Sequence, residues 1–333
     1  MPRTRRIRST RRLSRLVTAA VGLTSLLALT GCGADASADA SAKGQVTLTI
    51  GDQAKTLQTI VAASDALKGA DYKVKWAEFE GAAPLYQAVQ AGAADTAYSA
   101  DLPALQALSG GVKFKNVAAL KNDGTHVGIV VRKDSGIDSV KDLKGQKVVV
   151  SSAKGSISEY LLANALQQAG LKYSDVKVQY LLPTDAQAAF SSGKIKTWAI
   201  FGVYQAVALE QGGKLLVDGA DGRVSGYGFI GASDKALADS AKKAALGDFL
   251  ERLGTALEWT STHQDAYAKA IETRNGADAS VAKTLASAAY SKVLPITGDV
   301  NTTVQGVADL MHGIGVLDPN VDVAKSADTT LLK

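Results

Sequence analysis

The stretch Ala83–Leu108, APLYQAVQAGAADTAYSADLPALQAL, runs as a helix, a glycine, a buried strand, a loop and a second helix. The stretch Thr184–Leu209, TDAQAAFSSGKIKTWAIFGVYQAVAL, follows the same order, and its pivot glycine comes 101 residues after that of the first. Identity between the two is low, so an internal repeat and a chance similarity of two α/β units both remain open. Two similar lobes would enclose a cleft, since ligands of open α/β sheets bind outside the carboxyl ends of strands. The strand ends at Ser99 and Ile200 would then face each other across it.

Strand and helix patterns alternate on both sides of these stretches. The first strand is expected at Val46–Ile50 (VTLTI), where polar and apolar residues alternate strictly. Further strands are expected at Lys73–Trp76, Thr96–Ser99, Gly128–Arg132, Gln146–Val150, Val176–Tyr180 and Thr197–Ile200, and helices at Thr56–Lys68, Pro84–Ala91 and Leu102–Leu108. After residue 233 the pattern is almost wholly helical, over Asp234–Thr262, Gln264–Arg274, Ala279–Tyr290 and Val304–His312. Such alternation predicts an α/β fold with largely parallel sheets, followed by a helical C-terminal part.

The positive charge of the chain is concentrated at its start. The chain has 37 lysines and arginines against 32 aspartates and glutamates, but seven arginines and no acidic residue precede Cys32. The remainder has 30 basic against 32 acidic residues, so the net charge of +5 gives no support for nucleic acid binding. With 333 residues, of which 46% are hydrophobic, the chain is long enough for two domains with a substantial core.

Residues 1–31 have the pattern of a secretory signal peptide. The arginines are followed by the uncharged run Leu16–Thr30 (LVTAAVGLTSLLALT), which is too short for a comfortable membrane span. Leu29–Cys32 (LTGC) resembles a bacterial lipobox, in which the cysteine becomes the lipidated first residue of the mature protein. Cys32 is the single cysteine, and the alternative of a buried free thiol fits poorly between an apolar run and a low-complexity tract. Thr10–Ser14 resembles a twin-arginine signal except at Ser14, so the export route stays open.

Residues 32–44 are expected to form a flexible tether. The tract Ala34–Ala42 (ADASADASA) has no apolar face to bury, and it would reach about 20 Å from the membrane surface. A folded body held on a lipid tether outside the cell membrane is suited to solute capture, polymer cleavage, adhesion or sensing. The sequence therefore predicts an extracytoplasmic, lipid-anchored protein.

The stretch Val148–Leu162 (VVVSSAKGSISEYLL) predicts a strand, a small polar loop and a helix start. A helix start offers unpaired N–H groups and partial positive charge to an anion, and the hydroxyls of Ser156 and Ser158 could add donors. The alternative is a capping box, with Ser156 as the cap and Glu159 at the third helical position. The two interpretations conflict in part, because Glu159 would compete for the dipole that an anion uses.

Two patterns that suggest nucleotide binding do not hold. The loop lacks the Gly-x-x-x-x-Gly-Lys-Ser/Thr spacing of a phosphate loop, since Lys154 precedes its glycine. The run Gly226–Gly231 (GYGFIG) matches Gly-x-Gly-x-x-Gly, but it lies within a strand pattern and is not followed at once by a helix. We interpret it as a strand that crosses between lobes, with Tyr227 as a candidate cleft residue.

Seven segments together resemble the substrate-binding lipoproteins of ABC importers for aliphatic sulfonates, taurine and nitrate. They are Gly51–Gln53, Ala91–Asp95, Tyr98–Asp101, Asp134–Ile137, Val140–Val148, Gly155–Ser156 and Trp198–Ile200, within a likeness that spans roughly residues 45–317. The run Ile137–Gly145 (IDSVKDLKG) is the most specific of these, although it marks the superfamily rather than a ligand. The resemblance implies a two-lobed, type II periplasmic-binding-protein-like fold with two crossover strands. Lobe 1 would hold residues 45–131 and 226–333, and lobe 2 residues 132–225.

In the resembling family the acid group of the ligand is held by the loop that matches residues 155–158. The opposite segment departs from the family, which tends to have Asp at 196, Trp at 201 and Asp-Pro at 202–203, where this chain has Lys, Phe and Gly-Val. Lys196 would favour an anion if it faced the cleft, but a solvated residue at a strand edge is the favoured interpretation. Phe201 and Tyr204 could pack on the tail of a ligand or simply fill the core.

The inventory of reactive residues gives little support for an enzyme. His126, His263 and His312 are isolated, and the sequence has no metal-binding spacing of His or Cys and no Gly-x-Ser-x-Gly elbow. Asp95 and Asp101 are lone acids, too common to indicate hydrolysis. His126 could touch a ligand near the first crossover or be a buried structural histidine. Some proteins of this fold act in thiamine-precursor or chorismate chemistry, although a lipid anchor argues against cytosolic biosynthesis.

The sequence thus predicts a binding lipoprotein that captures a small organic anion, an aliphatic sulfonate or a taurine-like solute, and delivers it to an ABC permease and its ATPase subunits. We expect a monomer with no cofactor, metal, catalytic residue or nucleic acid partner. The alternatives are a protein that binds a thiamine precursor or another small metabolite, and an enzyme on the same fold. The predicted ligand-binding residues are Gln53, Ser99, Ala100, His126, Ser156, Ile157, Ser158, Phe201, Tyr204 and Tyr227.

Overall fold

The computed structural model describes residues 45–288 and 292–332. The predicted signal peptide, Cys32 and the tether lie outside the described residues. The strands are β1 Thr47–Gln53, β2 Lys73–Phe79, β3 Thr96–Ala100, β4 Phe114–Lys121, β5 Val127–Arg132, β6 Lys147–Val150, β7 Lys177–Tyr180, β8 Thr197–Phe201, β9 Gly213–Asp218, β10 Tyr227–Ser233 and β11 Lys292–Leu294. No helix in the described part is both long and apolar enough to cross a membrane.

The helices alternate with the strands up to β10 and then follow one another, as the sequence pattern predicts. They are α1 Thr56–Ala63, α2 Ala82–Gln90, α3 Asp101–Ser109, α4 Ile157–Gln168, α5 Pro183–Ser191, α6 Gly202–Glu210, α7 Asp234–Ala238, α8 Ser240–Thr262, α9 Gln264–Asn275, α10 Ala279–Ser287 and α11 Gly298–Gly313. Short 3-10 turns occur at Val140–Leu143, Tyr173–Asp175 and Ala324–Ser326.

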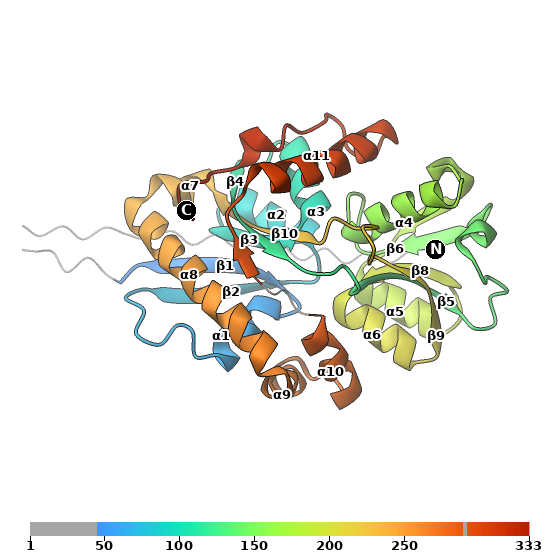
Figure 1. Cartoon of the computed structure of the whole chain (residues 1–333), viewed down its shortest axis with the longest axis horizontal. Helices are drawn as coiled ribbons and strands as arrows, with labels where there is room; N and C mark the ends of the chain where they lie inside the picture. Colours follow the sequence, from blue (N-terminus) through green and yellow to red (C-terminus); the bar gives the residue numbers. More distant parts are fainter. Residues whose placement is uncertain (1–44, 289–291, 333) are drawn as a thin grey trace, which may run out of the picture. The chain divides into compact units, whose positions relative to one another are not determined.

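The strands form two sheets with related orders. The first sheet has the order β11-β4-β10-β3-β1-β2, and the second has the order β7-β6-β8-β5-β9. In both, three parallel strands (β2-β1-β3 and β7-β6-β8) continue into antiparallel ones. The green to yellow segments of Figure 1 gather around the second sheet, while blue and orange-to-red segments surround the first. The first sheet is therefore built from segments far apart in the sequence, and the second from one continuous segment.

The two similar stretches of sequence form the same three elements. The first contains α2, β3 and α3, the second contains α5, β8 and α6, and every bound differs by 101 residues. Gly92 and Gly193, which end α2 and α5, both adopt positive φ, 73° and 75°. That backbone conformation is costly for residues with a Cβ, so glycine at this point allows the chain to reverse into the buried strand.

Two crossovers connect the sheets, one between β4 and β5 and the other between β9 and β10. The first boundary predicted from the sequence, at residue 131, falls inside β5. All of β5 pairs with β8 and β9, so the chain passes to the second sheet within residues 122–126. The run Gly226–Gly231 lies mostly in β10, which pairs with β3 and β4, as expected for a crossover strand.

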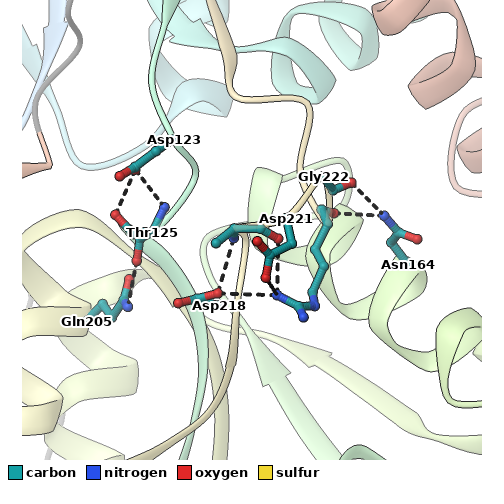
Figure 2. A network of polar contacts seen from close by, with 9 residues as sticks. Asp123, Thr125, Asn164, Gln205, Asp218, Asp221 and Gly222 are labelled. Atoms are coloured by element: carbon teal, nitrogen blue, oxygen red, sulfur yellow. Dashed lines mark hydrogen bonds and ion pairs between the residues drawn. The ribbon is translucent and has the colours of Figure 1, made fainter.

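Both crossovers are fastened to helices of the second sheet (Figure 2). Gln205 of α6 donates from Nε2 to the carbonyl oxygen of Thr125 at 3.1 Å. Asn164 of α4 donates from Nδ2 to the carbonyl oxygen of Arg223 at 2.9 Å. Arg223 in turn lies 3.5 Å from Asp218 at the end of β9. The crossover backbones are thus held by hydrogen bonds where no sheet pairing is available.

The C-terminal helices cover the first sheet. Phe249, Leu250 and Leu253 of α8 pack in one apolar cluster with Leu48 and Ile50 of β1. The predicted single helix Asp234–Thr262 is broken into α7 and α8 at Asp239. Asp239 is extended, and its carboxylate accepts hydrogen bonds from Ala241 N and Lys242 N, which starts a new helix there.

Strands β4, β9 and β11 have no counterpart among the strands predicted from the sequence. The last of them, β11, has only three residues. It pairs antiparallel with β4 through Lys292–Leu294 and forms one edge of the first sheet. β4 is almost fully buried, so β11 supplies partners to backbone groups that would otherwise lie at an open edge.

Candidate functional site

A pocket of about 360 Å³ lies at the carboxyl ends of strands from both sheets. Eight of the ten predicted ligand-binding residues line it: Gln53, Ser99, Ala100, His126, Ser156, Ile157, Phe201 and Tyr204. They come from the ends of β1, β3 and β8, from the first crossover and from the starts of α4 and α6. This is the place where open α/β sheets generally bind ligands.

Ser158 and Tyr227 lie outside the pocket wall. Ser158 is fully buried, and its hydroxyl donates to the carbonyl oxygen of Ser151, so it supports the loop before α4. The ring of Tyr227 lies under the ammonium group of Lys121, 4.0 Å from the ring centroid, and Tyr227 N donates to Ser225 Oγ. The structure therefore places both residues outside the wall, in contrast to the expectation that they contact a ligand.

Five helices present their first residues to the pocket. Lining residues come from the starts of α1, α2, α3, α4 and α6, namely Thr56, Ala82, Pro103, Ile157 and Gly202. Because each helix start carries partial positive charge and unpaired N–H groups, the arrangement favours negative charge in the pocket. The starts differ in whether the protein itself supplies that negative charge.

The start of α4 is already provided with a carboxylate. Ser156 is the cap residue, and its Oγ accepts a hydrogen bond from Glu159 N at 3.3 Å, which confirms the predicted cap. The Glu159 side chain folds back to accept a hydrogen bond from Gly155 N at 2.6 Å. The Glu159 carboxylate therefore lies at this helix start, as predicted, and its competition with an anion stays a prediction.

The starts of α1 and α3 also carry buried carboxylates. Asp52 accepts hydrogen bonds from the N–H groups of Gln53, Leu57 and Gln58. Burial raises the pKa of Asp52 to about 7, against the opposing effect of these N–H donors. Asp101 accepts from Leu102 N and from the hydroxyl of Ser225 in the second crossover.

Burial raises the pKa of Asp101 as well, to about 6, although its hydrogen bonds and nearby Lys121 oppose the shift. Both carboxyls are therefore partly protonated near neutral pH, which reduces the negative charge that they place behind the pocket.

The starts of α2 and α6 have no such carboxylate. Their cap residues, Gly81 and Phe201, provide no side-chain cap. The first residue of α6, Gly202, adopts a φ of 60° and donates its N–H to the carbonyl oxygen of His126 at 2.7 Å. These two helix starts leave more of their positive potential for a ligand than those of α1, α3 and α4.

His126 and Lys196 were the uncertain candidates in the sequence. Burial lowers the pKa of His126 to about 4, so its imidazole is neutral near pH 7 despite nearby Asp123. Lys196 is exposed and precedes β8, at the end of the strand opposite the pocket. The favoured interpretation of Lys196, a solvated residue at a strand edge, agrees with this position.

Sequence reasoning missed the wall that the C-terminal helices contribute. It consists of Tyr267, Ile271 and Asn275 of α9 and Leu285 of α10, together with Ala288 just beyond α10. These residues belong to long helical patterns without a local motif, so only the tertiary packing places them at the pocket. It also missed the tyrosines Tyr86 and Tyr98; Tyr86 shares a 2.9 Å hydrogen bond with Ser99 Oγ.

Residues that surround the first sheet contact residues that surround the second sheet near the loop before α4. Lys154 donates to the carbonyl oxygen of Gly315 at 3.0 Å, and Thr184 donates to Glu80 at 3.1 Å. Gly155 has a φ of 81°, and a Cβ there would come within 2.5 Å of the Gln106 side chain. Glycine is therefore required at residue 155 both by its backbone conformation and by the close approach of α3. Within the described residues, no group of three His, Cys, Asp or Glu could hold a metal ion.

The two α/β sheets, the paired crossovers and the pocket at the strand ends define a periplasmic-binding-protein fold. The family described as NMT1/THI5 like matches residues 67–266, and the chain belongs to this family. A protein of Escherichia coli (strain K12) named as an aliphatic sulfonates-binding protein is 32% identical over 281 residues, which cover 83% of this chain and 86% of that protein. A protein of the same name from Bacillus subtilis (strain 168) is 29% identical over 312 residues, 92% of each chain.

Solved structures agree with this assignment. The alkanesulfonate-binding protein SsuA from Xanthomonas axonopodis pv. citri, bound to MOPS, superposes with a TM-score of 0.79 at 25% identity, over 85% of this chain and 98% of that one. The desulfurization enzyme DSZB shares the fold at 14% identity, with a TM-score of 0.61 over 86% of this chain and 97% of that one. The resemblance and the fold predicted from the sequence are confirmed by these comparisons.

Proposed function

We propose that the protein is an extracytoplasmic solute-binding lipoprotein of an ABC importer. It captures a small organic anion, an aliphatic sulfonate or a taurine-like solute, and delivers it to the permease and its ATPase subunits. The observation that carries the proposal is the convergence of five helix starts on one pocket at the strand ends. The relatives named for sulfonate binding support the same ligand class.

Five of the eight predicted residues in the wall can be assigned to the head or to the tail of such a ligand. Gln53, Ser99 and Ser156 form hydrogen bonds with the oxygen atoms of the head group. Phe201 and Tyr204 pack on the tail. A dissociation constant near micromolar corresponds to about −8 kcal/mol. Hydrogen bonds to a charged head group of about 1.5–3 kcal/mol each, with burial of a short tail at about 0.8 kcal/mol per methylene, are sufficient for that affinity.

The identity of the ligand is tested most directly by native mass spectrometry of the purified protein, which reports any solute that copurifies. Calorimetry with ethanesulfonate, taurine, nitrate and sulfate then ranks the candidates. We expect a sulfonate to bind. Binding of a neutral or cationic solute, with none of these anions bound, would contradict the proposal.

The role of the loop before α4 is tested by two serine substitutions. Ser156→Ala removes a hydroxyl from the wall together with the helix cap, and we expect both weaker sulfonate binding and a loss of about 1 kcal/mol in unfolding free energy. Ser158→Ala removes a buried hydroxyl outside the wall, so it should lower stability by about 1 kcal/mol and leave calorimetric affinity unchanged. If Ser156→Ala also leaves the affinity unchanged, Ser156 is a cap and not a ligand-binding residue.

The proposed lipid anchor is tested at Cys32. The intact mass of the membrane-bound protein should exceed that of the cleaved chain by a lipid group, and Cys32→Ala should release the protein into the soluble fraction. A Cys32→Ala protein that stays membrane-bound through the same extraction would argue for a different anchor.

An enzyme on this fold, or a protein that binds a thiamine precursor, is the alternative function. The desulfurization enzyme with the same fold makes catalysis worth testing directly. We propose that this chain is not an enzyme, so candidate sulfonates incubated with the protein should be recovered unchanged by mass spectrometry. Release of a desulfonated product, or tight binding of a thiamine precursor in place of sulfonates, would favour these alternatives.

A further inference from the structure

A buried carboxylate stands directly behind the pocket wall. Glu159 is 0% exposed, and it follows the wall residues Gly155, Ser156 and Ile157. One of its oxygens, Oε2, accepts the hydrogen bond from Gly155 N at 2.6 Å. A single hydrogen bond therefore links the carboxylate to the wall.

The other oxygen of Glu159 is held by two tyrosines. Tyr180 donates its hydroxyl to Oε1 at 2.6 Å, and Tyr173 donates to the same atom. Burial and the adjacent carboxylate both raise the pKa of these phenols, so they remain protonated donors. Three donors thus surround the carboxylate of Glu159, and none of the ion pairs in the described part of the chain involves it.

The rest of the pocket offers little positive charge against it. Among the described residues of the wall, Lys154 is the one Lys or Arg, and its ammonium group is bonded to the carbonyl oxygen of Gly315. Glu80 adds a carboxylate to the wall, and Asp52 and Asp101 lie buried at the starts of α1 and α3. A negatively charged ligand in this pocket would be held by helix dipoles and hydrogen bonds, close to the carboxyl groups of the protein.

This arrangement distinguishes ligands by the number of negative charges that they carry. Repulsion from a buried carboxylate grows in proportion to the charge of the ligand, whereas a hydrogen bond to an oxygen atom changes much less. A sulfonate and a sulfate both present oxygen atoms on sulfur, but the sulfonate carries one negative charge and the sulfate two. The second charge brings further repulsion, and among its described residues this wall has no arginine to offset it.

We propose that Glu159 is a charge-selectivity residue, which lets the pocket accept singly charged sulfonates and reject dianions such as inorganic sulfate. This inference rests on the proposed function, because it assumes that an anionic head group enters the pocket. It does not depend on which helix start holds the head group, since the repulsion acts through space. It assigns Glu159 a role in ligand choice in addition to its role in the fold of the loop.

The wild-type protein can test the inference with one pair of probes. Ethylphosphonate resembles ethanesulfonate in shape, but it passes from a single to a double negative charge near neutral pH. We expect calorimetric affinity for ethylphosphonate to fall about threefold more than affinity for ethanesulfonate between pH 6 and pH 8.5. The ethanesulfonate profile corrects only for changes in the protein that affect both probes equally, and because ionisation of Asp52 and Asp101 repels a dianion more than a monoanion, the Glu159 variant is needed to assign the effect. Equal changes for both probes would overturn the inference.

Glu159→Gln identifies the residue responsible. The substitution should remove most of the difference between the two probes and allow sulfate to bind. Asp175→Asn is the matched control, because it removes the same charge from the same lobe at a residue whose carboxylate accepts Lys172 N and is absent from the wall. It should keep the wild-type difference. If Glu159→Gln keeps it too, or weakens both probes by the same factor, the role of Glu159 is only structural.

A further variant covers the case in which Glu159→Gln does not fold. Tyr180→Phe keeps the carboxylate but removes one of its donors, so the charge is less compensated. The ratio of ethanesulfonate affinity to sulfate affinity should then rise at least twofold, and an unchanged or smaller ratio would overturn the inference. A wild-type protein that binds neither ethanesulfonate nor ethylphosphonate would overturn the proposed function itself, which distinguishes the two failures.

Discussion

The stretches α2-β3-α3 and α5-β8-α6 have the same backbone plan and different chemistry. Matched positions, 101 residues apart, carry Ala97 and Trp198 in the middle of the strand and Asp101 and Gly202 at the start of the next helix. The apolar pattern and the pivot glycine are shared, and they suffice for the common fold. The residues that differ determine how each strand is supported and what charge it presents to the pocket.

The support of the two strands can be compared first. Trp198 is fully buried, packs with its ring centroid 5.8 Å from that of Phe190, and donates from Nε1 to Ser151 Oγ at 2.8 Å. It belongs to a small apolar cluster on the second sheet, separate from the larger core. Its counterpart, Ala97, lies within that larger core. Strand β8 is therefore supported largely by one large side chain, whereas β3 is supported by many residues of the larger core.

The largest effect is expected from Trp198→Ala. Removing this side chain leaves a cavity and an unpaired Ser151 hydroxyl, so unfolding free energy should fall by about 3–5 kcal/mol in chemical denaturation. Trp259→Ala is the control, because Trp259 is only partly buried and stacks on His263 at the surface. A loss at Trp198 no larger than at Trp259 would show that the cluster is not anchored by this residue.

The next effect is a pH dependence caused by Asp101, which has no counterpart at Gly202. Burial raises the pKa of Asp101 from 3.8 to about 6, so the folded state binds more protons than the unfolded state between these values. Its contribution therefore decreases unfolding free energy as pH rises from about 4 to about 6, by an amount on the order of 3 kcal/mol. Asp101→Asn should make the fall of unfolding free energy over that interval smaller by that amount, while the fall contributed by buried Asp52 remains.

The control for this prediction is Asp134→Asn. Asp134 is exposed, and its hydrogen bond to Arg132 lowers its pKa below 3.8, so it does not titrate between pH 4 and pH 6. Its variant should keep the wild-type slope. If the Asp101 variant keeps that slope as well, Asp101 is ionised throughout and its burial does not shift its pKa as stated.

The smallest effect is expected from Gly202→Ala. The position has a φ of 60°, and a Cβ there meets no atom within 4 Å, so the cost is backbone strain alone, about 1 kcal/mol. Gly298→Ala, at the first residue of α11, has equal space and no positive φ, and it should be neutral. Thermal unfolding of the two variants separates strain from packing. Equal melting temperatures would mean that the start of α6 adjusts without strain.

Much of the fold follows from local pattern, because a buried strand after a pivot glycine is visible in the sequence itself. The cap at Ser156 and the competing charge of Glu159 were predictable for the same reason, since they lie three residues apart. The tyrosines that hold Glu159 lie 14 and 21 residues away, so no local spacing identifies them. Strand β11 was missed because three residues carry too little periodicity, and their pairing with β4 depends on the folded sheet.

The positions of the strands along the sequence affect the order in which the two sheets can form. Every strand of the second sheet lies between Val127 and Asp218, so all its partners exist once that segment has been synthesised. The first sheet needs β10 and then β11, which closes the edge beside β4 only after Leu294. Until then β4 presents unpaired backbone groups, which are templates for pairing with another chain. The edge of β4 at residues 119–121 thus stays open until a three-residue strand near the end of the chain has been synthesised.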